Sequence, residues 1–250
     1  MNAASSPNKS LDKTISLFHQ VAPGPTLVGP EEPAVAGLVP FSSVDWPGHL
    51  SAVVFIGGCP WRCGYCHNPH LQSRRAQYHW PALCSWLETR RGLLDAVVFS
   101  GGEPLSERLL PQMIAAVRDM GFKVALHTAG IYPNRLAQIL PNLNWVGLDI
   151  KTHAKGHDAL TGRERSHAPA AASLELLLES GIPFECRTTW SPAWLSETEL
   201  LALAQDLAAR GVVQYAVQNY RVKPDIAPTA WLSTAARQQL QSWFRCFEYR

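Results

Sequence analysis

Short apolar runs that alternate with amphipathic stretches constrain the fold of this chain most. Six runs have the length and composition of buried strands: residues 52–56, 96–100, 123–127, 145–150, 183–189 and 214–218. Apolar residues recur at helical spacing in the stretches that follow them: residues 80–91, 106–120, 134–140, 168–180, 196–210 and 233–247. Gly121, Gly181 and Gly211 follow three of these stretches, as glycine often follows the last turn of a helix. The alternation predicts right-handed crossovers and a parallel sheet with helices outside it, either open or curved toward a barrel.

Composition indicates one folded domain after an N-terminal tail. The chain has 250 residues, of which 46% are hydrophobic and 17% charged, which is enough to bury a substantial core. Residues 1–33 are rich in Ser, Asn and Pro, and the prolines within 23–25 and 30–33 disfavour a long regular element. We therefore predict a flexible or loosely docked tail over residues 1–33 and a single domain over residues 34–250.

Charge and hydropathy argue against two classes of partner. The net charge is +2, and Lys and Arg form no run that could follow a phosphate backbone. No apolar stretch reaches the length of a membrane span, and residues 1–20 contain no apolar core of a secretory signal. We predict no nucleic-acid partner, no membrane association and a cytoplasmic location.

Three cysteines directly follow the first apolar run. Cys59, Cys63 and Cys66 lie within eight residues, and three thiolates so close together converge on one metal centre. An iron-sulfur cluster that only transfers electrons usually has four cysteine ligands, so a set of three suggests a coordination position reserved for a cofactor or substrate. The other cysteines are widely scattered, which does not suggest a disulfide framework, and we expect them to be buried small apolar residues: Cys84, Cys186 and Cys246.

Other uses of these cysteines remain open on the residues alone. Cys63, Cys66 and His67 also spell the C-x-x-C-H pattern of covalent haem attachment, which occurs outside the cytoplasm. The three cysteines and His67 could form a tetrahedral zinc site, although adjacent residues rarely chelate one zinc ion together. A redox pair of Cys63 and Cys66 would leave Cys59 without a role.

The residues around the cysteines resemble one enzyme family. The segment GCPWRCGYCHNP (58–69) resembles the signature of the radical S-adenosylmethionine enzymes, and VDWPG (44–48) upstream resembles a motif of their glycyl-radical-enzyme activating branch. Within that branch the chain resembles the anaerobic ribonucleotide reductase activating proteins. The resemblance implies a partial (β/α)6 barrel of the TIM type, with the catalytic domain over residues 34–250. It also implies one [4Fe-4S] cluster per chain, held by Cys59, Cys63 and Cys66.

The resemblance implies further cofactor-binding residues. The segment GGEP (101–104), after the second predicted strand, resembles the family's motif for the ammonium group of S-adenosylmethionine, and it assigns Gly101, Gly102 and Glu103 to cofactor binding. Tyr65 and His67 would flank the adenine through backbone contacts. Asn68 would tune the cluster by hydrogen bonding.

Two later strands end in charged residues that match the family's pattern. Asp149 and Lys151 resemble its D-x-K segment and are candidate catalytic residues, because the carboxyl ends of barrel strands face the site. Arg187 could supply a bidentate fork to the methionine carboxylate, or could pair structurally with Glu185 or another acid. His127 stands where the formate-lyase activators have an aspartate of a monovalent cation site, and imidazole is a poor ligand for such a cation. That cation site is therefore in doubt here.

The implied activity is that of an oxidoreductase that activates another protein. Reductive cleavage of S-adenosylmethionine would give a 5′-deoxyadenosyl radical, which takes a hydrogen atom from a glycine of the partner enzyme. The implied partners are a glycyl radical enzyme, with anaerobic ribonucleotide reductase first, and an electron donor of the flavodoxin or ferredoxin type. Three alternatives stay open: an activator of another glycyl radical enzyme such as pyruvate formate-lyase, a radical enzyme that modifies a small molecule or peptide directly, and a non-enzymatic zinc- or cluster-binding protein.

Overall fold

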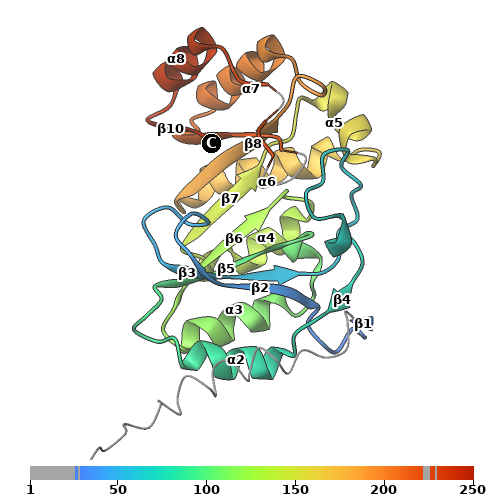
Figure 1. Cartoon of the computed structure of the whole chain (residues 1–250), viewed down its shortest axis with the longest axis vertical. Helices are drawn as coiled ribbons and strands as arrows, with labels where there is room; N and C mark the ends of the chain where they lie inside the picture. The colour runs from blue at the N-terminus through green and yellow to red at the C-terminus, as the bar shows by residue number, and fades with distance from the viewer. Residues whose placement is uncertain (1–25, 28, 222–225, 229) are drawn as a thin grey trace, which may run out of the picture.

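A curved sheet with its strands in chain order forms the centre of the molecule (Figure 1). The computed structural model describes residues 26–27, 29–221, 226–228 and 230–250. The eight strands of this sheet pair in the order β10-β9-β8-β7-β6-β5-β3-β2. Every neighbouring pair is parallel except β2 and β3, which are antiparallel. The strands are β2 (Val35–Ser42), β3 (Ser51–Ile56), β5 (Ala96–Gly101), β6 (Lys123–Thr128), β7 (Trp145–Asp149), β8 (Phe184–Trp190), β9 (Gln214–Asn219) and β10 (Cys246–Tyr249).

Helices follow the parallel strands and cover the outer face of the sheet. They are α2 (Trp80–Glu88), α3 (Leu110–Asp119), α4 (Pro133–Ile139), α5 (Ala154–Thr161), α6 (His167–Ser180), α7 (Glu197–Ala209) and α8 (Thr234–Trp243), with single turns of 3₁₀ helix η1 (Pro69–Leu71), η2 (Pro104–Ser106) and η3 (Leu140–Asn142). In Figure 1, α2 and α3 lie at one end of the row of strands and α7 and α8 at the other. The six predicted strands and the strand-helix order are confirmed, and the fold is the predicted partial barrel.

Local chemistry explains where several helices begin and end. At the start of α7, the Ser196 hydroxyl accepts a hydrogen bond from the Glu199 amide while the Glu199 carboxylate accepts one from the Ser196 amide, which is a complete capping box. At the end of α6, Gly181 adopts the left-handed conformation with φ of 71°, which a residue with a side chain rarely adopts.

The structure adds elements that the sequence did not predict. The helix predicted over residues 233–247 ends at Trp243, and its last predicted residues belong to β10 instead. Strand β2 and helix α5 were not predicted. Inside the predicted tail, β1 (Thr26–Leu27) pairs with β4 (Arg75–Ala76).

Alternate residues of each strand build two different cores. The outer face carries large aliphatic side chains, such as Val54, Val97 and Leu126, that pack against the helices. The inner face carries a smaller set of buried residues that fills the base of the half-barrel: Trp46, Val53, Ala96, Val98, Ala125 and Trp145. Toward the carboxyl ends of the strands the inner face becomes polar.

The remaining cysteines differ in burial. Cys186 is fully buried on β8, as expected, whereas Cys84 is half-buried and Cys246 is exposed, so the expectation of burial is wrong for Cys246. Cys246 is the first residue of β10, which lies at the edge of the sheet and pairs with β9 alone among the described strands. In the part of the chain that the structure describes, no helix combines the length and the apolar character needed to cross a bilayer.

Candidate active site

A loop that leaves β3 carries the three clustered cysteines. We call residues 57–68 the cysteine loop. Its start is tied to the turn around η1, because the Gly58 amide donates to the Leu71 carbonyl at 2.8 Å and the Cys59 amide donates to the Gln72 carbonyl at 3.0 Å. The loop therefore leaves the carboxyl end of β3 in a defined direction, at the edge of the sheet where barrel chemistry takes place.

The end of α5 holds the middle of the cysteine loop. The Arg62 amide donates to the Thr161 carbonyl at 2.7 Å, and the Gly64 amide donates to the Leu160 carbonyl at 3.0 Å. The last carbonyls of a helix have no hydrogen-bond partner within the helix. Two amides of the cysteine loop therefore supply hydrogen bonds that the end of α5 would otherwise lack. This anchoring could not be predicted because α5 itself was not.

The three cysteines line one cavity together with the ends of four strands. The cavity has a volume of about 160 Å³. Its walls include most of the predicted site residues and several others: Cys59, Trp61, Cys63, Tyr65, Cys66, His67, Asn68, Gln72, Ser100, Gly101, Gly102, His127, Thr128, Ala129, Asp149, Lys151 and Thr189. Glu103 and Arg187 are the two predicted residues that do not line it.

The three thiols are partly buried, and burial raises the pKa of two of them. All three cysteines are free thiols and half-buried. Burial raises the pKa of Cys59 to about 11, and burial also raises the pKa of Cys63. Iron would therefore displace protons when the thiolates bind it. Among the described residues, no group of three or more ligating side chains is already arranged to hold a metal ion, and this finding favours neither a cluster nor the zinc alternative.

The buried side chain of Trp61 packs beneath the cysteine loop and anchors it to the protein interior. It is 2% exposed and packs against Ile131 and Ala170. Its ring also meets the edge of His157 on α5 at 5.3 Å between centroids. A bulky side chain between Cys59 and Cys63 thus anchors the loop to α5, to α6 and to the turn before α4.

The GGEP turn is built around two close backbone approaches. A Cβ atom on Gly101 would lie 2.3 Å from the Ile56 carbonyl oxygen, and one on Gly102 would lie 2.6 Å from the Gly58 carbonyl oxygen. Both positions therefore require glycine. The turn packs directly on the start of the cysteine loop, which places the backbone of Gly101 and Gly102 beside the cysteines.

Glu103 is buried behind this turn. Its carboxylate accepts hydrogen bonds from the Thr128 hydroxyl at 2.6 Å and from the amides of Leu105 and Ala129, each at 3.0 Å. Burial raises the pKa of Glu103 to about 7, although these three hydrogen bonds act in the opposite direction. In this arrangement the carboxylate ties the ends of β5 and β6 together. Its predicted contact with the cofactor ammonium group stays a prediction.

Asp149 and Lys151 lie together at the end of β7. The Lys151 ammonium is 3.6 Å from Oδ2 of Asp149, hydrogen bonds to the Tyr65 hydroxyl and lies 5.4 Å from the centre of the Tyr65 ring. Burial acts to lower the pKa of Lys151, but Tyr65 and Asp149 outweigh burial and raise it above its ordinary value. Burial raises the pKa of Tyr65 to about 12. At neutral pH the cavity wall therefore carries a charged ammonium next to the cysteines.

Four aromatic side chains contact one another in series, from the cysteine loop across the mouth of the half-barrel. His67 stacks on Tyr220 at 5.2 Å between ring centroids, Tyr220 meets Trp194 at 4.7 Å, and Trp194 meets Tyr65 at 5.3 Å. Sequence reasoning missed Tyr220 and Trp194. Both follow the ends of strands, β9 and β8 respectively, and this position could have identified them.

Arg187 lies behind the cavity wall on the inner face of β8. Its Nε is 3.6 Å from Oδ1 of Asp149 and 3.9 Å from Oε1 of Glu185. This is the structural pairing with an acid that the sequence left open, and the assignment of Arg187 to the methionine carboxylate stays a prediction. His127 lies beside it, and its Nε2 is 2.7 Å from the carbonyl oxygen of Asp45. A carbonyl only accepts, so Nε2 of His127 carries a proton and donates it there.

The VDWPG segment closes the base of the half-barrel. Trp46 is 5% exposed and stacks on Trp145 at 6.1 Å between ring centroids. The Asp45 carbonyl from the same segment holds His127. Trp46 therefore belongs to the inner core beneath the site, whereas Val44, Pro47 and Gly48 are exposed, and no residue of the segment lines the cavity.

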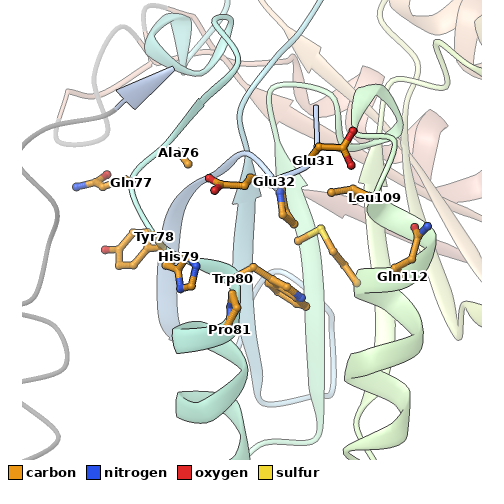
Figure 2. Close-up of a pocket in the computed structure, with 12 residues that line it drawn as sticks. Glu31, Glu32, Ala76, Gln77, Tyr78, His79, Trp80, Pro81, Leu109 and Gln112 are labelled. Atoms are coloured by element: carbon orange, nitrogen blue, oxygen red, sulfur yellow. The ribbon is translucent and has the colours of Figure 1, made fainter. Parts of the chain in front are cut away.

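A larger cavity lies elsewhere, beside the first residues of α2 and α3 (Figure 2). Its volume is about 520 Å³, and its walls include Tyr78, Trp80, Leu109 and Met113, with Glu31 and Glu32 at the rim. It contains no cysteine and none of the predicted site residues. Size alone therefore does not identify the active site, and the smaller cavity combines the thiols with the charged strand ends.

Comparison with known proteins gives results that agree with this geometry. The model of the radical SAM superfamily matches residues 53–191, which is more than half of the chain. A protein of Methanocaldococcus jannaschii that is named for glycyl-radical enzyme activation is 27% identical over 209 residues, covering 76% of this chain and 80% of that protein. The pyruvate formate-lyase-activating enzyme of Clostridium pasteurianum is 34% identical over 128 residues, covering 48% of this chain and 53% of the enzyme. A PqqA peptide cyclase of Streptomyces rochei is 27% identical over 195 residues, covering 73% of this chain and 53% of the cyclase.

Solved structures show the same fold. SuiB of Streptococcus suis bound to S-adenosylmethionine superposes with a TM-score of 0.58 at 16% identity, covering 77% of this chain and 48% of SuiB. QueE from Escherichia coli superposes with a TM-score of 0.54 at 16% identity, covering 88% of this chain and 93% of QueE. With a family model that spans the cysteines and four of the strands whose ends surround them, the chain belongs to the radical SAM superfamily.

Proposed function

We propose that this chain is an activating enzyme that generates a glycyl radical on a partner protein, with anaerobic ribonucleotide reductase as the first candidate partner. One observation carries the proposal: the cysteine loop, the Gly101–Gly102 turn and the Asp149–Lys151 strand end meet in one cavity. Similarity to a protein named for glycyl-radical enzyme activation covers most of both chains and supports this reading. The choice of ribonucleotide reductase rests on the resemblance of residues 44–48 and 58–69 alone.

The residues present fit the groups that the superfamily requires. Cys59, Cys63 and Cys66 would hold a [4Fe-4S] cluster and leave one iron for S-adenosylmethionine. When bound, the cluster and the cofactor supply a 5′-deoxyadenosyl radical, with the electron coming from a flavodoxin or ferredoxin type donor. The backbone of Gly101 and Gly102 would receive the cofactor at close range, because no side chain stands in between.

The charged wall would orient and balance these groups. Three thiolates give the centre a negative charge, and the buried Lys151 ammonium on the same cavity compensates it. Asp149 holds Lys151 in place through their 3.6 Å contact. His67, Tyr220 and Trp194 form an apolar edge at the mouth against which a glycine-bearing loop of the partner would lie.

Direct modification of a peptide is the second candidate. Similarity to a PqqA peptide cyclase covers 73% of this chain but 53% of the cyclase, whereas the relative named for glycyl-radical activation is covered over 80% of its length. The more complete match favours activation of a partner enzyme.

A two-stage experiment tests the proposal. The chain is reconstituted anaerobically with iron and sulfide, reduced with dithionite, and assayed for 5′-deoxyadenosine. The wild type should cleave the cofactor, Cys63→Ala should not, and Cys246→Ala, which changes an exposed cysteine outside the cavity, should match the wild type.

The second stage adds a partner. Incubation with anaerobic ribonucleotide reductase should give the doublet signal of a glycyl radical by EPR, and a partner with alanine at the radical glycine should give none. Cofactor cleavage without a radical on this or any other glycyl radical enzyme, together with turnover of a peptide, would contradict the proposal and favour the second candidate.

A further inference from the structure

A buried guanidinium lies at the point where three parallel strands meet behind the site. Arg187 is 7% exposed and contacts side chains from β6, β7 and β8. Its Nη1 is 3.4 Å from Nε2 of His127, and its Nε faces the carboxylates of Asp149 and Glu185 at 3.6 Å and 3.9 Å. One rigid cation therefore lies beside side chains near the carboxyl ends of β6 and β7 and near the start of β8.

The sequence leaves space for this cation. Gly147 lies two residues before Asp149 on β7, and a Cβ atom there would lie 2.1 Å from Nη2 of Arg187. Any side chain at position 147 would displace the guanidinium. The planar face of Arg187 also lies over Trp145, at 5.9 Å from the ring centre, so the group is packed from below as well.

The surrounding residues do not fit a monovalent metal ion. The Nε2 proton of His127 is already donated to the Asp45 carbonyl, and an imidazole nitrogen is a poor ligand for an alkali cation. The Thr128 hydroxyl donates to Glu103 and accepts from the Gly130 amide. Asp149 is the one carboxylate among the described residues that line the cavity, and it already has the Arg187 guanidinium near one oxygen and the Lys151 ammonium near the other. A metal ion among these groups would be repelled by two fixed cations.

We infer that Arg187 is a built-in cation that takes the place of a bound monovalent metal ion and positions Asp149, and through Asp149 the Lys151 ammonium, at the cavity wall. The residues form a continuous series: Nε of Arg187 lies against Oδ1 of Asp149, and Oδ2 of Asp149 lies against Nζ of Lys151. Arg187 does not line the cavity. It is a positioning residue and not a ligand of the cofactor.

The positioning role can be distinguished from an ordinary structural ion pair by comparing the two acids that contact Arg187, which are Asp149 and Glu185. Glu185 has a second partner, Nη2 of Arg250 at 2.7 Å, so Glu185 keeps a counter-ion when Arg187 is removed. Among the described residues, Asp149 then has Lys151 as its only remaining counter-ion. Loss of Arg187 should therefore affect Asp149 and Lys151 more than Glu185, and the effect should be felt in the cavity.

The first test measures the need for a metal cation in the wild type. Reconstituted protein is exchanged into potassium, sodium or tetramethylammonium chloride at equal ionic strength. The three salts screen charges equally, so the affinity for S-adenosylmethionine and the rate of 5′-deoxyadenosine formation should agree within about twofold among them. The midpoint of thermal unfolding should agree within a few degrees. A wild type that needs potassium or sodium would overturn the inference.

The second test removes the guanidinium group of Arg187 by substitution and supplies guanidinium again as a free ion in solution. Arg187→Ala should weaken cofactor affinity or slow cleavage by about tenfold, and millimolar guanidinium chloride should restore most of the loss. Tetramethylammonium, which has no hydrogen-bond donors, should not. Arg187→Lys keeps the charge without the fork and should fall between the two. Arg250→Ala, the matched control at the other partner of Glu185, should match the wild type in affinity and rate.

The readouts separate this inference from the proposed function, on which it rests only for the cleavage assay. Guanidinium should raise the unfolding midpoint of Arg187→Ala and not that of the wild type, and this measurement needs neither cofactor nor partner. If no variant cleaves the cofactor, the function fails while the thermal measurement still decides the role of Arg187. An Arg187→Ala protein with wild-type affinity, or one that guanidinium does not affect, would overturn the inference.

Discussion

At the scale of single residues, the backbone around Gly102 has no space for a side chain. A Cβ atom there would lie 2.6 Å from the Gly58 carbonyl oxygen and 2.7 Å from that of Leu71. Gly102→Ala should therefore lower the free energy of unfolding by about 2 kcal/mol, because the two opposing backbones must separate, and should reduce iron uptake. Urea unfolding and iron analysis measure both.

A control for this substitution lies in the same site. A Cβ atom on Gly64 would meet only Nε1 of Trp194, at an ordinary 3.7 Å. Gly64→Ala should leave stability and iron content close to wild type. Equal losses in the two variants would show that crowding is not the reason for glycine at position 102.

Glu103 should make the stability of the metal-free chain depend on pH. Burial raises its pKa from 4.5 to about 7, so the folded chain holds a proton that the unfolded chain has released. The free energy of unfolding should therefore fall as the pH rises from 4.5 to 7, by roughly 3 kcal/mol from this group. Glu103→Gln should remove that slope in urea unfolding measured at several pH values. Glu179→Gln, an exposed glutamate on α6, is the control that should follow the wild type, and a slope that survives in Glu103→Gln would contradict the assignment.

Sequence alone predicted the residues that line the cavity better than the residues that support them. The cysteines, the two glycines and the pair of Asp149 and Lys151 were found because each follows a recognisable strand, and strand ends converge in this fold. The packing of the Arg187 guanidinium against Gly147 could not be predicted in this way. It depends on the register between β7 and β8, which pairs residues 38 positions apart, as for Gly147 with Glu185 and Asp149 with Arg187.

At the scale of secondary-structure elements, α5 determines the shape of the cysteine loop through its last turn. Ser166 stabilises this turn, because its hydroxyl is 2.6 Å from Nδ1 of His157 and 2.7 Å from the Thr161 hydroxyl, and the residue is 2% exposed. Ser166→Ala should cost about 1–3 kcal/mol, since it leaves buried polar groups without a partner. It should also speed the loss of iron to a chelator.

The matched control is a serine on α8. Ser242 is exposed and donates only to the Gln239 carbonyl within its own helix. Ser242→Ala should change neither urea unfolding nor the rate of iron loss. Wild-type iron retention in Ser166→Ala would show that α5 does not control the loop.

The elements that sequence reasoning missed share a physical cause. Helix α5 is short and contains Gly156 and three polar residues of low helix propensity, so tertiary contacts stabilise it more than its own sequence does. Strand β2 contains Gly37 and Pro40, which disfavour a central strand but are tolerated at the edge of a sheet. Strand β10 directly follows a helix, and its apolar residues continue the helical pattern closely enough to hide the boundary.

At the scale of the whole molecule, the half-barrel has two edges, and β10 protects one of them. Its Arg250 amide donates to the Val217 carbonyl, its Arg250 carbonyl accepts from the Asn219 amide, and the Tyr249 hydroxyl donates to Oδ1 of Asn219. Deletion of residues 246–250 should lower the unfolding midpoint by roughly 6–12 °C, because a loss of about 3 kcal/mol has that effect in a chain of this size. Glu248→Ala, an exposed change within the same strand, should shift the midpoint far less. Differential scanning calorimetry distinguishes the two, and an unchanged midpoint after the deletion would show that β9 is a sufficient edge.

The hydrogen bonds between the cysteine loop and α5 also bear on how such a protein matures. Backbone hydrogen bonds hold Arg62 and Gly64 against the end of α5, and hold Gly58 and Cys59 against the turn around η1. Assembly of a cluster there would then exchange thiol protons for iron along a backbone path that these hydrogen bonds define.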